Sequence, residues 1–306
     1  MKQGNKNTVR HFKTISDMHR ELGLPKVLHP LISILDYSEV KITREMLAEN
    51  FVMEFYNITY NESPGCSMKY GQTTYDFNEG GMLFTSPGQF LAGIKSMDST
   101  AGFTLLIHPD FLRTYPLAAR MKNYGFFSYA VTESLYLSDK EKNIIKTIAN
   151  IIKDELKTTI DDLSQDVLVS QIELLLNYSQ RFYKRQFITR KTLNHDILTK
   201  LEEILNRYFE QEEPLQNGLP TVEFLAGKLN FSPRYLSDML RAFTGQNAQQ
   251  LIHAKVIERA KEKLTSTDLT VSEVAYELGF GHSQSFNKLF KAKTNQTPLE
   301  FRASFN

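Results

Sequence analysis

The sequence predicts an α+β chain with two domains: a β-barrel or β-sandwich followed by two long helices, then an all-α domain with two helix-turn-helix units. Three observations lead to this fold class. Short apolar runs separated by turn residues fill the first third, apolar residues recur at helical spacing from Ser138, and the last third contains an internal repeat. A chain of 306 residues exceeds a single small core, and we expect the domains to span residues 1–189 and 190–306.

Composition excludes several classes of protein. Hydrophobic residues make up 41% of the chain, which allows real cores and argues against overall disorder. The 36 basic and 35 acidic residues nearly balance, so net charge neither supports nor opposes a nucleic-acid partner. Cys66 is the single cysteine, so a disulfide framework within one chain and a cysteine zinc site are excluded. Without an apolar signal segment in residues 1–24 or a long apolar run, we expect a cytoplasmic protein with no membrane span.

The first domain is expected to consist of short strands. Its apolar and β-branched runs are residues 31–35, 51–60, 82–84 and 103–107. Turn-forming residues gather between these runs, at residues 63–65, 78–81, 86–88 and 99–102. Short strands at this spacing are typical of a β-sandwich or a β-barrel.

Two long amphipathic helices are predicted after the strands. Ser138 is a candidate N-cap, and apolar residues recur on one helical face through residues 144–156. A second helix is predicted from Leu163 to about Phe182. Its apolar stripe either covers the barrel or pairs with a second chain, and the pattern is compatible with both.

A basic segment stands between the two domains. Residues 181–191 contain five basic and no acidic side chains. Such a run is usually a solvated face or a linker, and we place the interdomain linker and hinge near residues 190–196.

The strongest signal is the repeat in the last third. Residues 221–231 align with residues 270–280 at an offset of 49, with Thr, Val, Ala, Leu and Phe at equal places. The matches include the turn positions as well as the apolar ones, which argues against an accidental repeat in an ordinary helical bundle. The alignment predicts helix-turn-helix units at about residues 221–245 and 270–295.

Each copy follows the same local rules. It starts at a threonine that can cap a helix, continues as a short apolar face, and then breaks. Asn230 and Gly279 stand at the two breaks, and both residue types tolerate a positive φ. A second helix follows and ends at Gly245 in the first copy and at Asn295 in the second, both suited to a left-handed cap.

The outer face of each second helix carries side chains that can read base edges. Arginine and lysine suit guanine, and glutamine and asparagine suit adenine. Asp238 either accepts from cytosine or pairs with Arg241, and Lys291 is better suited to a phosphate. The candidate DNA-binding residues are Arg234, Ser237, Asp238, Arg241, Ser283, Gln284, Asn287, Lys288 and Lys291.

A set of residues in this region forms a specific signature: Ala260, Leu264, Val271, Val274, Ala275, Leu278, Gly279, Phe280, Phe286, Phe290, Lys291, Pro298, Phe301 and Arg302. In these residues the chain resembles the AraC/XylS family of bacterial transcription regulators. The resemblance implies a seven-helix domain in which a long helix, at about residues 254–264, joins the two units. It also implies recognition helices about one DNA turn apart, ~34 Å. Asn295 replaces a usual glycine, and His282 replaces a more frequent acidic residue, which puts local DNA contacts there in doubt.

Residues 80–89 and 103–111 are similar to parts of the cupin-like effector and dimerisation domains of the same family. The resemblance implies a homodimer and a small-molecule effector for the first domain, and promoter or operator DNA for the second. RNA polymerase is a candidate protein partner. The alternative is a first domain that serves only for dimerisation or protein contact.

An enzyme is the rival interpretation. Metal cupins need two histidines separated by one residue, with a third histidine and a carboxylate. None of the seven histidines lies two positions from another, so we expect no metal site. Cys66 lies in a predicted turn without an identifiable partner histidine, so a thiol enzyme is not expected either. We therefore expect no catalytic residue, no metal and no cofactor.

Overall fold

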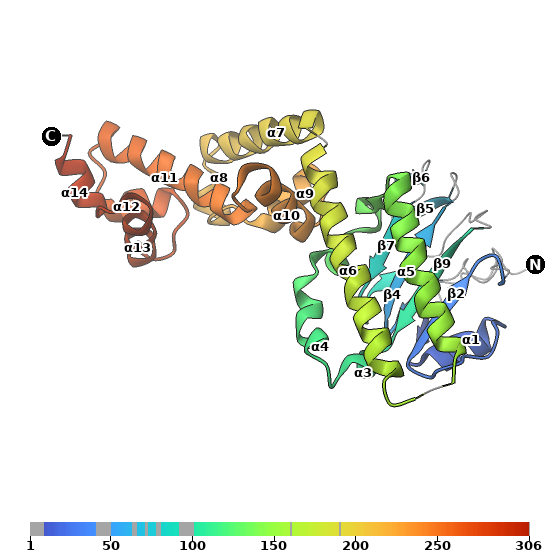
Figure 1. The fold of residues 1–306 in the computed structure, drawn as a ribbon. Helices are drawn as coiled ribbons and strands as arrows, with labels where there is room; N and C mark the ends of the chain where they lie inside the picture. The colour runs from blue at the N-terminus through green and yellow to red at the C-terminus, as the bar shows by residue number, and fades with distance from the viewer. Residues whose placement is uncertain are drawn as a thin grey trace, which may run out of the picture. The chain divides into compact units, whose positions relative to one another are not determined.

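The structure is a computed structural model that describes residues 9–40, 50–62, 66–70, 73–77, 81–91, 101–159, 161–189 and 191–305 (Figure 1). The chain divides into two compact units, Met1–Gln186 and Phe187–Asn306. The side chains of residues 66–77 and 191–194 are outside this description.

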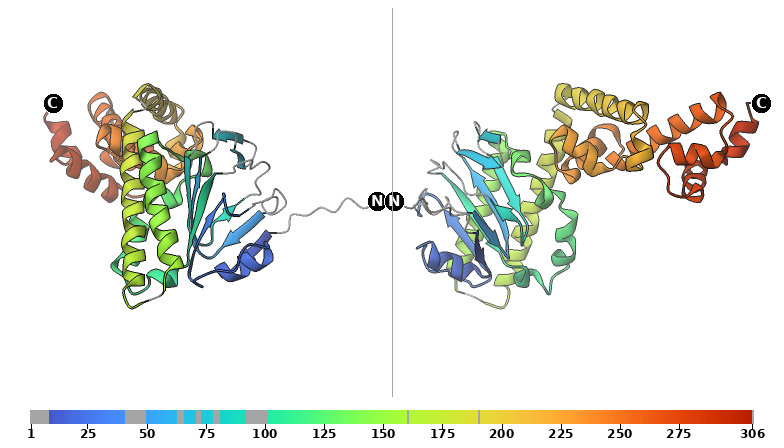
Figure 2. Two further views of the ribbon diagram at one scale, coloured as in Figure 1. Left: turned by 45° about the vertical axis from the view of Figure 1, so that its right-hand side comes forward. Right: turned by 180° about the vertical axis from the view of Figure 1, so that it is seen from behind.

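Strands form three sheets in the first unit (Figures 1 and 2). The largest is antiparallel, with the order β10-β7-β4-β9-β2. A smaller sheet has the order β1-β3-β8, and β5 pairs with β6 as a hairpin. The strands are β1 (Val9–Phe12), β2 (Ile32–Asp36), β3 (Asn50–Met53), β4 (Tyr56–Asn61), β5 (Cys66–Tyr70), β6 (Thr73–Phe77), β7 (Gly81–Thr85), β8 (Phe90–Leu91), β9 (Gly102–Ile107) and β10 (Leu135–Tyr136).

The first core lies between the two larger sheets, because it joins side chains from both. Phe12, Met53 and Leu91 come from the small sheet, and they cluster with leucines of β2, β7 and β9. Alternation along the strands sends these side chains to one face of each sheet. The predicted β architecture is therefore present as two sheets around a shared core.

Two sequence expectations about the strands were wrong. Residues 51–60 form two strands in different sheets, because Phe55 leaves the strand direction and is fully buried in the core. Cys66 begins strand β5 opposite Phe77, so it does not lie in a turn. The turn at residues 86–88 is present, with Gly88 at φ 77°, whereas residues 63–65, 78–80 and 99–100 lie outside the described residues.

Helices α5 (Asp139–Lys157) and α6 (Ser164–Thr189) lie side by side across one face of the large sheet (Figure 2). Ser138 caps α5 as predicted, and the Glu141 carboxylate accepts from its backbone N–H at 2.8 Å. The apolar stripes of both helices are largely buried, and Tyr183 of α6 stacks on Phe126 with ring centroids 5.6 Å apart. These stripes therefore cover the sheet. Helix α6 runs past its predicted end at Phe182.

Short elements complete the first unit. Helix α1 (Ile15–Glu21) follows β1, and Thr14 caps it. The chain from β9 to α5 contains α3 (Pro109–Leu112), α4 (Pro116–Arg120), and the 3₁₀ turns η1 (Met121–Asn123), η2 (Gly125–Ser128) and η3 (Val131–Glu133). Their low hydrophobic periodicity explains why the sequence pattern did not resolve them.

The second unit contains only helices among its described residues. They are α7 (Lys191–Glu210), α8 (Glu213–Asn217), α9 (Val222–Leu229), α10 (Pro233–Thr244), α11 (Ala248–Ser266), α12 (Val271–Glu277), α13 (Ser283–Thr294) and α14 (Pro298–Ala303). The short α8 is additional to the expected set. Residues 191–196, predicted as linker, begin α7 instead, because Ile197, Leu201, Leu205 and Tyr208 continue a buried helical stripe. No helix of the described chain is long and apolar enough to cross a membrane.

Candidate nucleic-acid interface

The first helix-turn-helix unit is built by its caps. The Thr221 hydroxyl accepts from the Phe224 N–H at 3.1 Å and starts α9. Asn230 takes a left-handed conformation at φ 59°, which turns the chain between the helices. The Ser232 hydroxyl then accepts from the Tyr235 N–H at 3.2 Å and starts α10, with Pro233 at its first position. Local sequence therefore specifies both helix starts and the turn.

The second helix-turn-helix unit repeats this construction with different residues. Thr270 and Glu273 form a capping box at the start of α12, in which the Glu273 carboxylate accepts from the Thr270 N–H at 2.7 Å. Gly279 makes the turn at φ 90°, and α13 follows. Asn295 ends α13 in the left-handed conformation at φ 60°, the role predicted for it.

The inner faces of α10 and α13 anchor them in the domain. Leu236 and Leu240 of α10 and Phe286 and Phe290 of α13 are all fully buried or nearly so. This burial sets which face of each helix remains outside. Of the predicted DNA-binding residues, Arg234, Arg241, Gln284, Asn287, Lys288 and Lys291 are exposed, and Ser237, Asp238 and Ser283 are partly buried.

The structure changes one expected pairing on α10. Asp238 pairs with Arg234, whose Nε donates to the carboxylate at 2.9 Å, and the predicted partner was Arg241. A spacing of four residues places the two side chains one above the other on the helix. Arg234 and Asp238 therefore form one polar unit on the α10 surface, and Arg241 lies one turn further along the same helix.

Charge differs between the two exposed faces. Helix α13 contains three lysines and no acidic residue, whereas α10 contains two arginines and one aspartate. Burial, together with the charge of nearby Lys293, lowers the pKa of His253 on α11. His253 therefore stays neutral near pH 7, and the positive charge beside α13 comes from its lysines.

Helix α11 makes polar contacts with α7, α12 and α14 through its C-terminal half. Arg259 donates to Asn206 of α7 at 3.3 Å, and Lys263 pairs with Glu277 of α12 at 2.5 Å. Arg302 of α14 donates to the Leu264 carbonyl at 3.0 Å. The sequence placed this helix at 254–264, but buried residues from Ala248 to Leu264 extend it.

A close backbone approach joins the second helix-turn-helix unit to the loop between α8 and α9. A Cβ added to Gly279 would lie 2.5 Å from the Gly218 carbonyl carbon and 2.8 Å from the Leu219 nitrogen. The Gly218 carbonyl in turn accepts from the Tyr208 hydroxyl at 2.9 Å. Gly279 is therefore required both for its positive φ and for this contact. The sequence pattern indicated only the first requirement.

The capping box at Thr270 leads to a prediction about acid stability. Hydrogen bonds from the backbone and hydroxyl of Thr270 lower the pKa of Glu273 from its ordinary value of 4.5. A lowered folded-state pKa contributes stability that is complete above the ordinary value and is lost as the pH falls through the lowered value. We expect Glu273→Gln to lower the melting temperature at neutral pH, and the difference from the native chain to shrink below pH 4.5. Thermal unfolding of both chains across this range tests it, and a difference independent of pH would contradict the assignment.

The described ranges contain no group of three or more His, Cys, Asp or Glu side chains placed to hold a metal ion. His108 instead caps α3, where its Nδ1 accepts from the Asp110 N–H at 3.3 Å. The interface of α10 and α13 is the site that the described residues support best.

A family model and several known proteins are similar to parts of this chain. A family model described as a helix-turn-helix domain matches residues 225–304, which include the whole predicted signature. An uncharacterised HTH-type transcriptional regulator of Staphylococcus aureus is 24% identical over 204 residues, and the match covers 60% of this chain and 26% of that protein. The chain thus spans about a quarter of the length of that relative.

Two further matches differ in extent. The uncharacterised HTH-type transcriptional regulator YfiF of Bacillus subtilis is 25% identical over 258 residues, which are 82% of this chain and 77% of that protein. A solved structure, the C-terminal domain of the two-component response regulator yesN from Fusobacterium nucleatum, is 30% identical with a TM-score of 0.29. It covers 33% of this chain and 96% of its own length.

Proposed function

We propose that this chain, whose carboxy-terminal domain is a helix-turn-helix domain of the AraC type, is a transcription regulator that binds specific sites in double-stranded DNA. The observation that carries the proposal is the repeated unit itself. Each copy buries one face of its second helix and leaves the other face with cations, amides and hydroxyls. Such groups are the ones that recognise base edges and phosphates in the major groove.

In this proposal α10 and α13 enter successive segments of the major groove on one face of the duplex. Arg241 and the Arg234–Asp238 pair read one segment, and Gln284, Asn287 and Lys288 read the other, with Ser237 and Ser283 at the edges. Lys291 contacts phosphate. The packing of α11 against α10 and against α12 and α13 supports a fixed spacing of the two recognition helices, of about one DNA turn, ~34 Å.

We further propose that the first unit is a cupin-like domain that dimerises or binds a small effector. Two cavities of about 220 Å³ and 180 Å³ that open beside α5 support the effector role. Val167 and Leu174 of α6 support the dimer, because they lie two turns apart and are 39% and 41% exposed. Such an effector changes DNA binding only if it favours one arrangement of the two units over another. RNA polymerase remains a candidate partner in the cytoplasm.

Selection from random duplex DNA by the full chain, near physiological salt, tests the proposed function. We expect an enriched motif with two blocks about one helical turn apart. Binding of the folded chain without any sequence preference would contradict the recognition assignment, and absence of binding would contradict the function itself.

Substitutions on α13 separate base reading from phosphate contact. Gln284→Ala is expected to relax one position of the motif at a cost of about 1–3 kcal/mol. Lys291→Ala is expected to weaken all sequences equally and to reduce the salt slope of binding by about one charge. Lys140→Ala, an exposed change of the same charge on α5, is the control. Affinities measured over a salt series would contradict the two roles if Lys291→Ala altered the motif and Gln284→Ala did not.

A further inference from the structure

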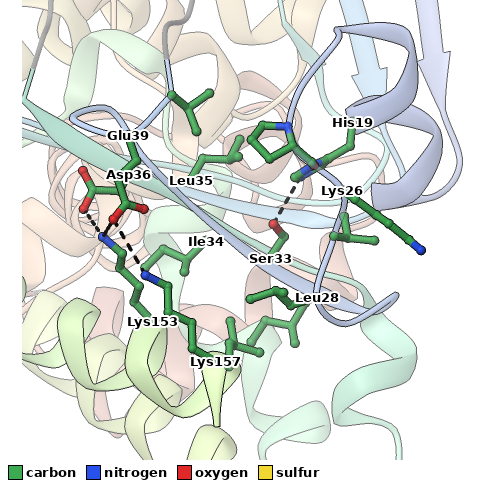
Figure 3. A pocket seen from close by; sticks show the side chains of 15 residues that line it. His19, Lys26, Leu28, Ser33, Ile34, Leu35, Asp36, Glu39, Lys153 and Lys157 are labelled. Carbon is green, nitrogen blue, oxygen red and sulfur yellow. Dashed lines mark hydrogen bonds and ion pairs between the residues drawn. The ribbon is translucent and has the colours of Figure 1, made fainter.

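Two neighbouring cavities open between helix α5 and the outer face of the large sheet, and they share Ile34, Asp36 and Lys153. The first has a volume of about 220 Å³ and is lined by His19, Leu28 and Leu156 among others (Figure 3). The second has a volume of about 180 Å³ and is lined by Tyr60, Glu62, Lys146 and Asn150 as well as the shared residues. Both lie within the first unit, and the first also reaches Val27, Leu35 and Val40 at the edge of the core between the two sheets.

The first cavity has its polar groups satisfied. His19 donates through Nδ1 to the Pro25 carbonyl at 2.6 Å and accepts at Nε2 from the Ser33 hydroxyl at 3.1 Å. At the other end, Lys153 binds Asp36 at 2.5 Å and Glu39 at 2.9 Å (Figure 3). These contacts hold the wall of the cavity together and give a ligand no orphan group to bind.

The second cavity differs, because one of its buried polar groups lacks a partner. Tyr60 of β4 is fully buried, and its hydroxyl makes no hydrogen bond to any described residue. Burial and, secondarily, the nearby Glu62 carboxylate raise the pKa of Tyr60, so the hydroxyl stays protonated and can donate. A buried donor without an acceptor is costly, and native structures seldom leave one unless another molecule uses it.

Charges of both signs surround this donor. Lys146 of α5 binds Glu62 at 2.8 Å, and Lys153 binds Asp36 at 2.5 Å. The Lys146–Glu62 pair is partly exposed, with side-chain exposures of 41% and 39%, so it contributes little stability and can exchange partners. Two lysines and two carboxylates leave the lining neutral. A ligand with a single charge would therefore add an uncompensated charge, whereas a ligand with both charges can pair with each kind.

Apolar groups complete the cavity. Ile34, Phe103 and Ala149 line it beside the charged residues, and an apolar side chain can be buried against them. A volume of about 180 Å³ accommodates a molecule no larger than a free amino acid.

We propose that this second cavity binds a small zwitterion of the amino-acid type with an apolar side chain. Its carboxylate accepts from the Tyr60 hydroxyl and pairs with Lys146, its ammonium group pairs with Glu62 or Asp36, and its side chain lies against Ile34 and Phe103. The inference deepens the proposed effector role of the first unit and rests on it. Because its test uses no DNA, failure to bind a ligand and failure to bind DNA are separate results.

Calorimetric titration of the full chain with each of the common L-amino acids tests the proposal. We expect saturable binding of at least one amino acid with an aliphatic or aromatic side chain. Its N-acetyl and methyl ester derivatives, which each keep one charge, should bind at least about tenfold more weakly. If no amino acid binds at millimolar concentration, or if a derivative binds equally well, the proposed ligand class is wrong.

Substitution of Tyr60 separates this site from any other on the chain. Tyr60→Phe removes only the orphan hydroxyl, so the free chain should keep or gain thermal stability while its amino-acid affinity falls about tenfold. Tyr56→Phe is the matched control, because Tyr56 lies four residues before Tyr60 on the same face of β4. This substitution should leave the amino-acid affinity unchanged. Unchanged affinity in Tyr60→Phe would overturn the assignment of the site.

Discussion

Gly279→Ala is expected to destabilise the second helix-turn-helix unit by about 2–5 kcal/mol and to weaken DNA binding strongly. Two costs add. A residue with a Cβ must adopt φ 90°, which costs about 1–2 kcal/mol, and the Cβ must be placed 2.5 Å from the Gly218 carbonyl carbon. Because the added Cβ would meet backbone atoms, the clash is relieved only if the turn at Gly279 and the chain at Gly218 move apart, at about 1–3 kcal/mol.

Two other glycines of the same domain separate these costs. Gly281→Ala is the neutral control, since its added Cβ meets nothing within 4 Å and its φ is not in the left-handed region. Gly245→Ala carries the strain alone, with φ 78° and open space around it. Hydrogen exchange of residues 271–294 and affinity for the selected DNA measure the effects. If Gly279→Ala matched Gly245→Ala in both measurements, the contact with Gly218 would be unimportant.

Phe290→Ala is expected to have the largest effect of the substitutions considered, a loss of about 3–5 kcal/mol from the carboxy-terminal domain. The ring is fully buried, and its centroid lies 5.7 Å from that of Phe286 and 5.5 Å from that of Phe301. Removing it leaves a cavity between α13 and α14 at the point where α13 is anchored. The outer face of α13 would then lose its fixed orientation toward DNA.

Denaturant unfolding measures this loss of stability. Hydrogen exchange of α13 and α14 shows whether these helices remain protected. Leu299→Ala on α14 is the control, because Leu299 is 66% exposed and its truncation leaves no internal cavity. Sequence preference should be lost with the fold of α13 and retained in Leu299→Ala. Native protection of α13 in Phe290→Ala would contradict the anchoring role.

The limits of the sequence pattern can be traced to particular residues. The division of residues 51–60 between two strands was not predicted, because aromatic and β-branched residues stand on both sides of the break at Glu54 and Phe55, and the Phe55 ring is buried in the shared core. The linker prediction was wrong at residues 191–196 because charge was used as the signal. The buried stripe from Ile197 to Tyr208 lies just beyond it and recruits these residues into α7.

The cavity beside α5 could not have been predicted from sequence. Tyr60 belongs to β4, Lys146 to α5 and Asp36 to β2, and their positions in the chain are far apart. Alternation along a strand tells which residues share a face, but the layer that covers that face is set by packing alone. The polar lining of the cavity therefore appears only when α5 is placed on the sheet.

The helix-turn-helix units follow from local sequence, because their caps and turns are local: Thr221, Asn230, Thr270 and Asn295 each act within a few residues of their own position. The spacing of apolar residues likewise sets which faces of α10 and α13 stay outside. Contacts between distant segments, in contrast, depend on the tertiary packing. The pairing of Gly279 with Gly218, the shared core of the two sheets and the unpartnered hydroxyl of Tyr60 all belong to this class. Local hydrogen bonds are specified by neighbouring residues, whereas these contacts are specified by the packing of whole elements.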